Sequence, residues 1–207
     1  MSASPKITRP ALYRASQFFA AVKAVLLPGG LTQADEALVT AILTAPAQQR
    51  LFARMSPNDR RHALAVVRTL QQAGYEQPAL LQAALLHDVA KSLGQPILHR
   101  VAIVLLKAFW PAALERICEW RTANGEWRAR IEDSSIRLFA YSPIPYWRRP
   151  FVIHAHHPAI GAAWVEEAGC DPLAVRLIAR HQETLTGQPA GEEEKLLAAL
   201  QWADNLN

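Results

Sequence analysis

An apolar helical run that ends in a histidine and an aspartate constrains the fold of this chain more than any other stretch. The run, residues 83–86, leads directly into His87 and Asp88. In a helix Asp88 would extend the buried face that Leu81 and Leu85 begin, since it follows them by seven and three residues. An ionised carboxylate on a buried face is costly unless it is paired or binds a metal, and the neighbouring imidazole offers a nitrogen ligand. The stretch therefore predicts a buried site that the rest of the chain has to complete.

The composition favours an all-α protein. The chain has 207 residues, 51% of them hydrophobic, with Ala and Leu prominent, and strand-like alternation of β-branched and aromatic residues is nearly absent. This length can bury one sizeable core together with a small helical appendage. We expect residues 1–50 to form a helical N-terminal appendage that packs over the main domain or makes a homodimer contact, and residues 51–207 to form the main domain.

Charge, cysteine spacing and hydropathy exclude several classes of protein. The net charge of +4 and the pI of about 9.3 are compatible with an anionic substrate, but the excess is too small to indicate a nucleic-acid polymer as partner. Cys118 and Cys170 lack CxxC spacing, which argues against a disulfide framework or zinc ribbon and favours reduced thiols. The apolar stretch 18–27 contains Lys23 and precedes no cleavage site, and the run 101–114 is too short for a membrane span. We therefore expect a soluble, cytoplasmic protein.

Capping residues and helix breakers predict the helices. Thr32, with Asp35 three residues later, resembles a capping box. Ser56 and Asp171 each precede a proline that would occupy the first helical position. Helices are expected over 11–27, from 32 onward, 57–73, 78–93, 96–108, 111–123, 126–140, 159–168, 172 to about 181, and 192–206. His157-Pro158 is expected to open the helix 159–168, and 142–145 and 186–191 are expected to be loops.

Histidines and aspartates near the expected helix ends form a candidate metal site. Because they are spread over five helices, only the tertiary fold of a helical bundle could assemble them. Four imidazoles and two carboxylates without a thiolate suit Mn, Fe, Co, Ni or Zn and do not select among these metals. The set comprises His62, His87, Asp88, His157, His181 and Asp204.

The order of these residues resembles the HD-domain superfamily of metal-dependent phosphohydrolases over roughly residues 50–207. The elements that carry the resemblance are RRHALAVVRTL around His62, AALLHDVAKS around the His-Asp pair, and LLAALQWADNL around Asp204. HHPAIGA and RHQE, which contain His157 and His181, resemble elements of the subset that binds two metals. The resemblance implies an HD-type helical bundle in which one or two divalent transition metals are bound.

The resemblance also implies roles for the individual ligands. One metal would be held by His62, His87, Asp88 and Asp204, and a second by His157 and His181 with Asp88 as the bridge. His154 and His156 are alternatives to His157 as the ligand of that stretch, and His99 suits a surface or supporting role. Residues 181–182 and 187–189 read His-Gln and Gly-Gln-Pro, where the HD-GYP branch has two histidines and Gly-Tyr-Pro. This departure argues against a dedicated cyclic-di-GMP phosphodiesterase.

Basic residues beside the ligands are candidates for contact with an anionic substrate. Lys91 lies one helical turn after the His-Asp pair, where it would bind a substrate phosphate and stabilise charge in the reaction. The alternative for Lys91 is a solvated lysine that complements the helix dipole. Arg180 precedes His181 and is a second candidate for substrate binding, as are Arg61 and the pair 148–149.

The expected function is hydrolysis of a small phosphomonoester or phosphodiester, such as a nucleotide, by a metal-activated water. Asp88 and Lys91 are then the catalytic candidates. One alternative is an HD-type di-iron oxygenase acting on a small polar substrate, because some members of the superfamily use the same ligand set in that way. The other is a non-catalytic metal-binding signaling domain.

Overall fold

The computed structural model describes residues 30–93, 97–118, 145–185, 187 and 189–207. The chain divides into two units, Met1–Leu31 and Thr32–Asn207, and nearly all the described residues belong to the second unit. The helices predicted over 11–27 and 126–140, and the end of the helix predicted over 111–123, lie outside the described residues. The division predicted between residues 50 and 51 stays a prediction.

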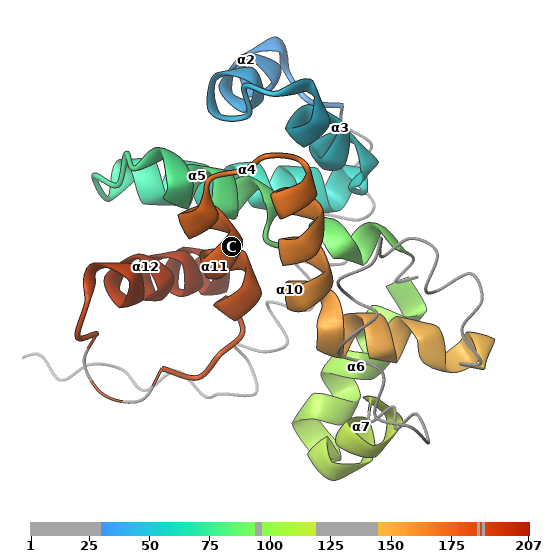
Figure 1. The fold of residues 1–207 in the computed structure, drawn as a ribbon. Coiled ribbons are helices and arrows are strands. Elements are labelled where there is room, and N and C mark those ends of the chain that lie inside the picture. The colour runs from blue at the N-terminus through green and yellow to red at the C-terminus, as the bar shows by residue number, and fades with distance from the viewer. Residues whose placement is uncertain (1–29, 94–96, 119–144, 186, 188) are drawn as a thin grey trace, which may run out of the picture. The chain divides into compact units, whose positions relative to one another are not determined.

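The described part of the chain is all-α, as predicted, and it contains no strand. Nine α-helices and two 3₁₀-helices follow one another (Figure 1). In chain order they are α2 (Gln33–Ile42), α3 (Pro46–Arg54), α4 (Pro57–Gln72), α5 (Pro78–Leu86), η1 (Val89–Leu93), α6 (Ile97–Phe109), α7 (Pro111–Cys118), η2 (Tyr146–Arg148), α10 (Arg149–Glu167), α11 (Pro172–Arg180) and α12 (Glu192–Leu206).

The predicted capping residues begin the helices they were expected to begin. Thr32 and Asp35 form a capping box at α2, with the Thr32 hydroxyl accepting the Asp35 amide. The Ser56 hydroxyl accepts the Asp59 amide at the start of α4, and the Asp171 carboxylate accepts an amide at the start of α11. Local hydrogen bonds therefore fix the entry of three helices.

The prediction that a helix opens at residue 159 is wrong. α10 begins at Arg149 and continues through Pro158, which lies inside the helix. Proline in a helix leaves the carbonyl four residues earlier without its backbone donor, here the carbonyl of His154. The ring of His157 supplies a substitute, because its Nδ1 lies 2.7 Å from that oxygen. The helix continues since the orphaned acceptor has a new partner.

The apolar helix α5 lies at the centre of the second unit. Seven of its nine residues are buried, as expected of a helix that is apolar on all sides. It contacts α2, α3, α4, α11 and α12, and Figure 1 shows α4 and α5 side by side. α5 thus carries the His-Asp pair at its C-terminal end into the centre of the packed helices.

A smaller apolar cluster joins α6 and α7 to α10. Ile103, Leu114 and Phe151 are buried together, with further apolar side chains of α6 and α7 packed against them. Among the described helices, none is both long enough and apolar enough to cross a membrane. α10 therefore links this cluster to α11 and η1, which it also contacts.

Replacing Ser56 with alanine should destabilise the protein because the first turn of α4 loses its side-chain cap. The Ser56 hydroxyl accepts the Asp59 amide at 3.2 Å and donates to the Asp59 carboxylate at 2.7 Å. The expected cost is about 1 kcal/mol, which lowers the melting temperature by about 3 °C for a chain of this size. Thr40→Ala is the control, because the Thr40 hydroxyl only donates to a carbonyl of its own helix. Equal melting temperatures for Ser56→Ala and the unaltered protein would contradict the capping role.

Candidate metal centre

The fold brings all six predicted ligands together. They come from α4, from the residues that directly follow α5 and α11, from the middle of α10 and from the last turns of α12. The histidine rings are close neighbours: His62 and His87 are 5.5 Å apart between centroids, His87 and His181 5.3 Å, and His157 and His181 5.1 Å. Within each of two triads, one ligand atom per residue lies within 4.8 Å of the others. The two His/Asp triads could therefore each hold a metal ion.

His62, His87 and Asp204 form the first triad. Oδ1 of Asp204 lies 2.8 Å from Nε2 of His62 and 3.4 Å from Nε2 of His87. The His87 side chain is 1% exposed, while those of His62 and Asp204 are 24% and 33% exposed. This triad is therefore open to solvent on one side.

Asp88, His157 and His181 form the second triad, which is buried throughout. Oδ1 of Asp88 lies 3.3 Å from Nε2 of His157 and 3.9 Å from Nε2 of His181. The two Nε2 atoms are 3.2 Å apart. Three potential donors to a metal thus converge in a space closed to solvent.

Asp88 connects the two triads through its two oxygens. Oδ1 is directed at His157 and His181, whereas Oδ2 lies 3.6 Å from Nε2 of His87 and 2.5 Å from the ammonium of Lys91. The geometry groups Asp88 with His157 and His181, so its predicted part in the first triad depends on Oδ2 alone. A carboxylate with its oxygens divided in this way is suited to bridge two ions.

Three of the histidines are oriented by the same backbone interaction. Nδ1 of His87 lies 3.0 Å from the Ala84 carbonyl, and Nδ1 of His181 lies 2.8 Å from the Ile178 carbonyl. Both acceptors are in the last turn of a helix, where carbonyls have no intrahelical donor. In His157 the acceptor is the carbonyl that Pro158 leaves free. Each ring therefore carries its proton on Nδ1 and presents an unprotonated Nε2 to the site when neutral.

Sequence reasoning identified the histidines but missed these carbonyl acceptors. The available signal was positional: His87 and His181 lie near the ends of expected helices, and a proline directly follows His157. Hydrogen bonds of this kind set the tautomer and ring direction of metal-binding histidines.

The unsatisfied polar atoms of the site fit a bound cation. Nε2 of His87 and Oδ1 of Asp88 are buried and make no hydrogen bond, a costly arrangement without a further partner. The unprotonated Nε2 atoms of His157 and His181 cannot hydrogen-bond each other at 3.2 Å. Ligand atoms on one transition-metal ion, bound at about 2.0–2.2 Å each, are separated by roughly 3–3.5 Å. The residues present therefore fit metal ions of the kind the donor set favours.

The charges of the metal-free site balance within it. Burial lowers the pKa of His87, but the carboxylates of Asp88 and Asp204 outweigh burial and raise it to about 9. Burial also favours the protonated form of Asp88, yet the charges of Lys91 and His87 hold its pKa well below the usual range. Burial lowers the pKa of His181 to about 3, so this ring is neutral. In the metal-free site, the protonated His87 and the ammonium of Lys91 thus supply the positive charge that bound metal ions would otherwise supply to the carboxylates.

The other histidines lie outside both triads. His154 stacks on His157 with ring centroids 6.0 Å apart, and burial lowers its pKa to about 4. His99 packs against Phe151 in the smaller apolar cluster, at 5.8 Å between centroids. Burial lowers the pKa of His156. Among the described groups that could hold a metal, none includes these three histidines.

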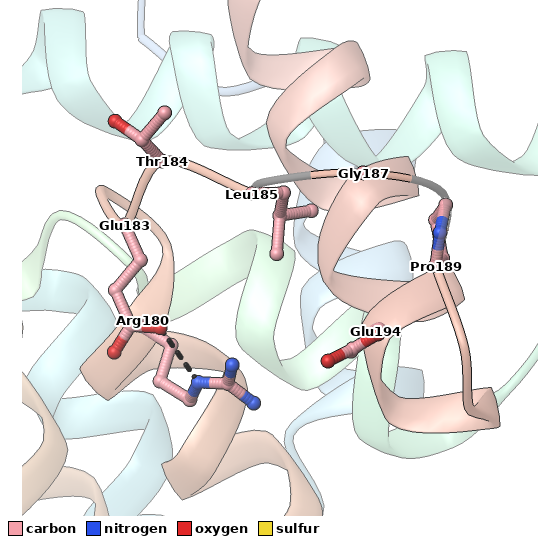
Figure 2. Close-up of a pocket in the computed structure, with 7 residues that line it drawn as sticks. All are labelled: Arg180, Glu183, Thr184, Leu185, Gly187, Pro189 and Glu194. Atoms are coloured by element: carbon pink, nitrogen blue, oxygen red, sulfur yellow. Dashed lines mark hydrogen bonds and ion pairs between the residues drawn. The ribbon is translucent and has the colours of Figure 1, made fainter.

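Lys91 and Arg180 have different surroundings. Lys91 is bonded to the central carboxylate of the site and its side chain is 22% exposed, so it lies between the second triad and solvent. The Arg180 guanidinium pairs with Glu183 at 2.8 Å and with Glu193 at 3.0 Å. It helps line a pocket of about 240 Å³ formed mainly by the residues that connect α11 to α12, and Figure 2 shows Thr184, Leu185 and Pro189 among the lining residues. No triad residue lines this pocket, and substrate binding by Arg180 stays a prediction.

No family model, curated protein or solved structure matches this chain.

Metal binding should release a proton from His87. With a pKa of about 9, His87 is protonated in the metal-free protein at neutral pH, and a metal has to displace that proton. We expect release of about one proton for the ion bound by the first triad, and an apparent affinity of that triad that rises about tenfold per pH unit up to pH 9. Calorimetric titration with Mn²⁺ or Zn²⁺ in two buffers of different ionisation enthalpy measures the release. Uptake of metal without proton release between pH 6.5 and 8.5 would contradict the assignment of His87.

Replacing Pro158 with alanine should weaken metal binding while stabilising the metal-free helix. The new amide would compete with Nδ1 of His157 for the His154 carbonyl, so the ring loses its fixed direction. Loss of such a supporting bond lowers metal affinity by about tenfold or more, whereas removing a proline from a helix interior favours the helix. Metal titration and thermal melting of the metal-free protein give the two readouts. Pro111→Ala, at the first position of α7, is the control, and unchanged metal affinity in Pro158→Ala would refute the role.

Proposed function

We propose that this protein is a metal-dependent phosphohydrolase that acts on a small phosphomonoester or phosphodiester, of which a nucleotide is the leading candidate. The observation that carries the proposal is the division of the two Asp88 oxygens between neighbouring His/Asp triads. A pair of ions joined by a carboxylate is a common arrangement in enzymes that hydrolyse phosphoesters. The ordered elements that resemble the HD-domain superfamily support the same function.

The ligands divide between two ions in this proposal. His62, His87 and Asp204 would hold one ion, His157 and His181 the other, and Asp88 would bridge them. When bound, such ions supply a water of lowered pKa and neutralise charge on the phosphoryl oxygens. The protein's own contribution is to hold four imidazoles with Nε2 towards this point and to exclude solvent from the second triad.

Lys91 has a role that depends on Asp88. In the metal-free site its ammonium neutralises Oδ2 of Asp88 at 2.5 Å. A metal ion bound to Oδ2 would replace this ion pair, and the ammonium of Lys91 would then be available to pair with an anionic group of the substrate. Its partial exposure supports this role, because the ammonium is accessible from solvent while it contacts a buried ligand.

Asp88→Asn should abolish phosphatase activity and reduce the bound metal. The amide keeps the shape of the side chain but loses the charge that both ions would share, so we expect at least about a 100-fold loss of kcat. The measurement is phosphate release from a panel of nucleotides and phosphoesters with Mn²⁺, Co²⁺ or Ni²⁺ added, together with metal content per chain. Asp171→Asn is a matched control, because asparagine caps a helix as well as aspartate does.

Three outcomes would overturn the proposal. Near wild-type activity and metal content in Asp88→Asn would show that the site is elsewhere. Two irons per chain with a mixed-valence EPR signal and no phosphate release would favour the di-iron oxygenase. Stoichiometric metal without turnover of any phosphoester in the panel would favour a non-catalytic signaling domain.

A further inference from the structure

The outer face of α6 is apolar and uncovered in the described structure. Its inner face carries Ile103, which is buried against Phe151 of α10. On the outer face Val104, Leu105 and Phe109 are 60%, 48% and 67% exposed. α6 also carries Lys107, so it is not apolar all round, but both its inner and its outer face carry apolar side chains, and an apolar face of a helix is normally packed against another element. We therefore expect another molecule to cover the outer face of α6.

Most of the large exposed apolar side chains of the described residues lie in α6, at its junction with α7 and in η2. Nine large hydrophobic side chains are exposed, and only three of them lie elsewhere: Tyr75, Trp202 and Leu206. The other six lie along α6, at its junction with α7 and in η2, and we call them the α6–η2 surface: Val104, Leu105, Phe109, Trp110, Tyr146 and Trp147.

Hydrogen bonds hold η2 against α7. The Arg148 guanidinium donates to the Ile117 carbonyl at 2.8 Å and to the Arg116 carbonyl at 3.1 Å. α7 in turn contacts α6, and both contact α10 (Figure 1). The α6–η2 surface thus belongs to one packed group of elements and is not a set of scattered side chains.

This group of elements is also basic. The ranges 101–118 and 145–150 contain Lys107, Arg116, Arg148 and Arg149 but a single acidic residue, Glu115. Their net charge of +3 compares with +4 for the whole chain. Arg148 lies over the Trp147 ring at 6.0 Å and Arg149 over the Tyr146 ring at 5.8 Å. Exposed aromatic rings therefore stand next to cationic groups.

We propose that the α6–η2 surface binds the surface of an anionic phospholipid bilayer, with the protein attached peripherally. Trp and Tyr favour the membrane–water interface because one edge of the ring is polar. Apolar side chains enter the headgroup region while basic residues pair with anionic headgroups. α6 has 13 residues, too few to cross the hydrocarbon core, so the attachment is superficial. A second copy of the chain is disfavoured because it would bring two basic surfaces together.

The proposed membrane-binding surface and the metal centre are connected by α10. This helix begins beside η2, packs Phe151 into the α6–α7 cluster, and carries His157 further along. The proposal does not depend on the proposed phosphohydrolase activity, since it uses none of the triad residues.

Co-sedimentation of the full chain with vesicles tests the proposal. We expect binding to vesicles of equal phosphatidylcholine and phosphatidylglycerol, weaker binding at higher salt, and little binding to phosphatidylcholine alone. Phe109→Ser with Trp110→Ser should lower the affinity by about tenfold or more. Both side chains are about two-thirds exposed, so the helical content measured by far-UV circular dichroism should be unchanged. Trp202→Ser, an exposed tryptophan of α12, is the matched control and should bind like the unaltered protein.

Arg116→Glu, at an exposed position of α7, provides an independent variant that leaves the apolar side chains in place. Reversing this charge should lower the affinity for anionic vesicles by about tenfold or more and leave the helices intact. Absence of binding to anionic vesicles, or equal binding by all variants, would overturn the proposal. A dimer in light scattering that the Phe109 and Trp110 changes dissociate, without vesicle binding, would assign the surface to a second copy instead.

Discussion

The buried carboxylate of Asp88 is the interaction on which the site depends. Burial disfavours its ionised form, but the positive charges of the Lys91 ammonium and the protonated His87 ring outweigh burial and keep Asp88 ionised. The apolar helix α5 leads the chain to this position, and α4, α11 and α12 pack against α5. These helices also carry or lead into ligands, so the same packing that buries the core sets the distances between the triads.

Backbone carbonyls that lack a backbone donor orient three of the four imidazoles. Helix ends leave carbonyls without donors, and His87 and His181 use such carbonyls to fix their rings. Pro158 creates an equivalent acceptor inside a continuous helix. Three ligands are thus held by features that would otherwise be defects of helical hydrogen bonding, and no additional side chains are required to orient them.

The parts of the structure that depend on neighbouring residues were predictable from sequence. The cap at Ser56 and the helix Glu192–Leu206 follow from local rules, and both were confirmed. The start of α10 was mispredicted because Pro158 is a strong local stop signal, and the ring that compensates for it is a side-chain effect. The grouping of Asp88 with His157 and His181 depends on the direction of single oxygen atoms, which sequence spacing does not determine.

The two triads differ in how far apart along the chain their members lie. Asp88 and His181, the outermost members of the second triad, are separated by 93 residues, while His62 and Asp204 are separated by 142. Closing a long loop costs more entropy than closing a short one and delays the contact during folding. The solvent-open triad therefore requires α12 to dock on α4 before it exists. Complete metal loading would then report that α12 has docked on α4, so that a chain without a folded α12 lacks the full centre.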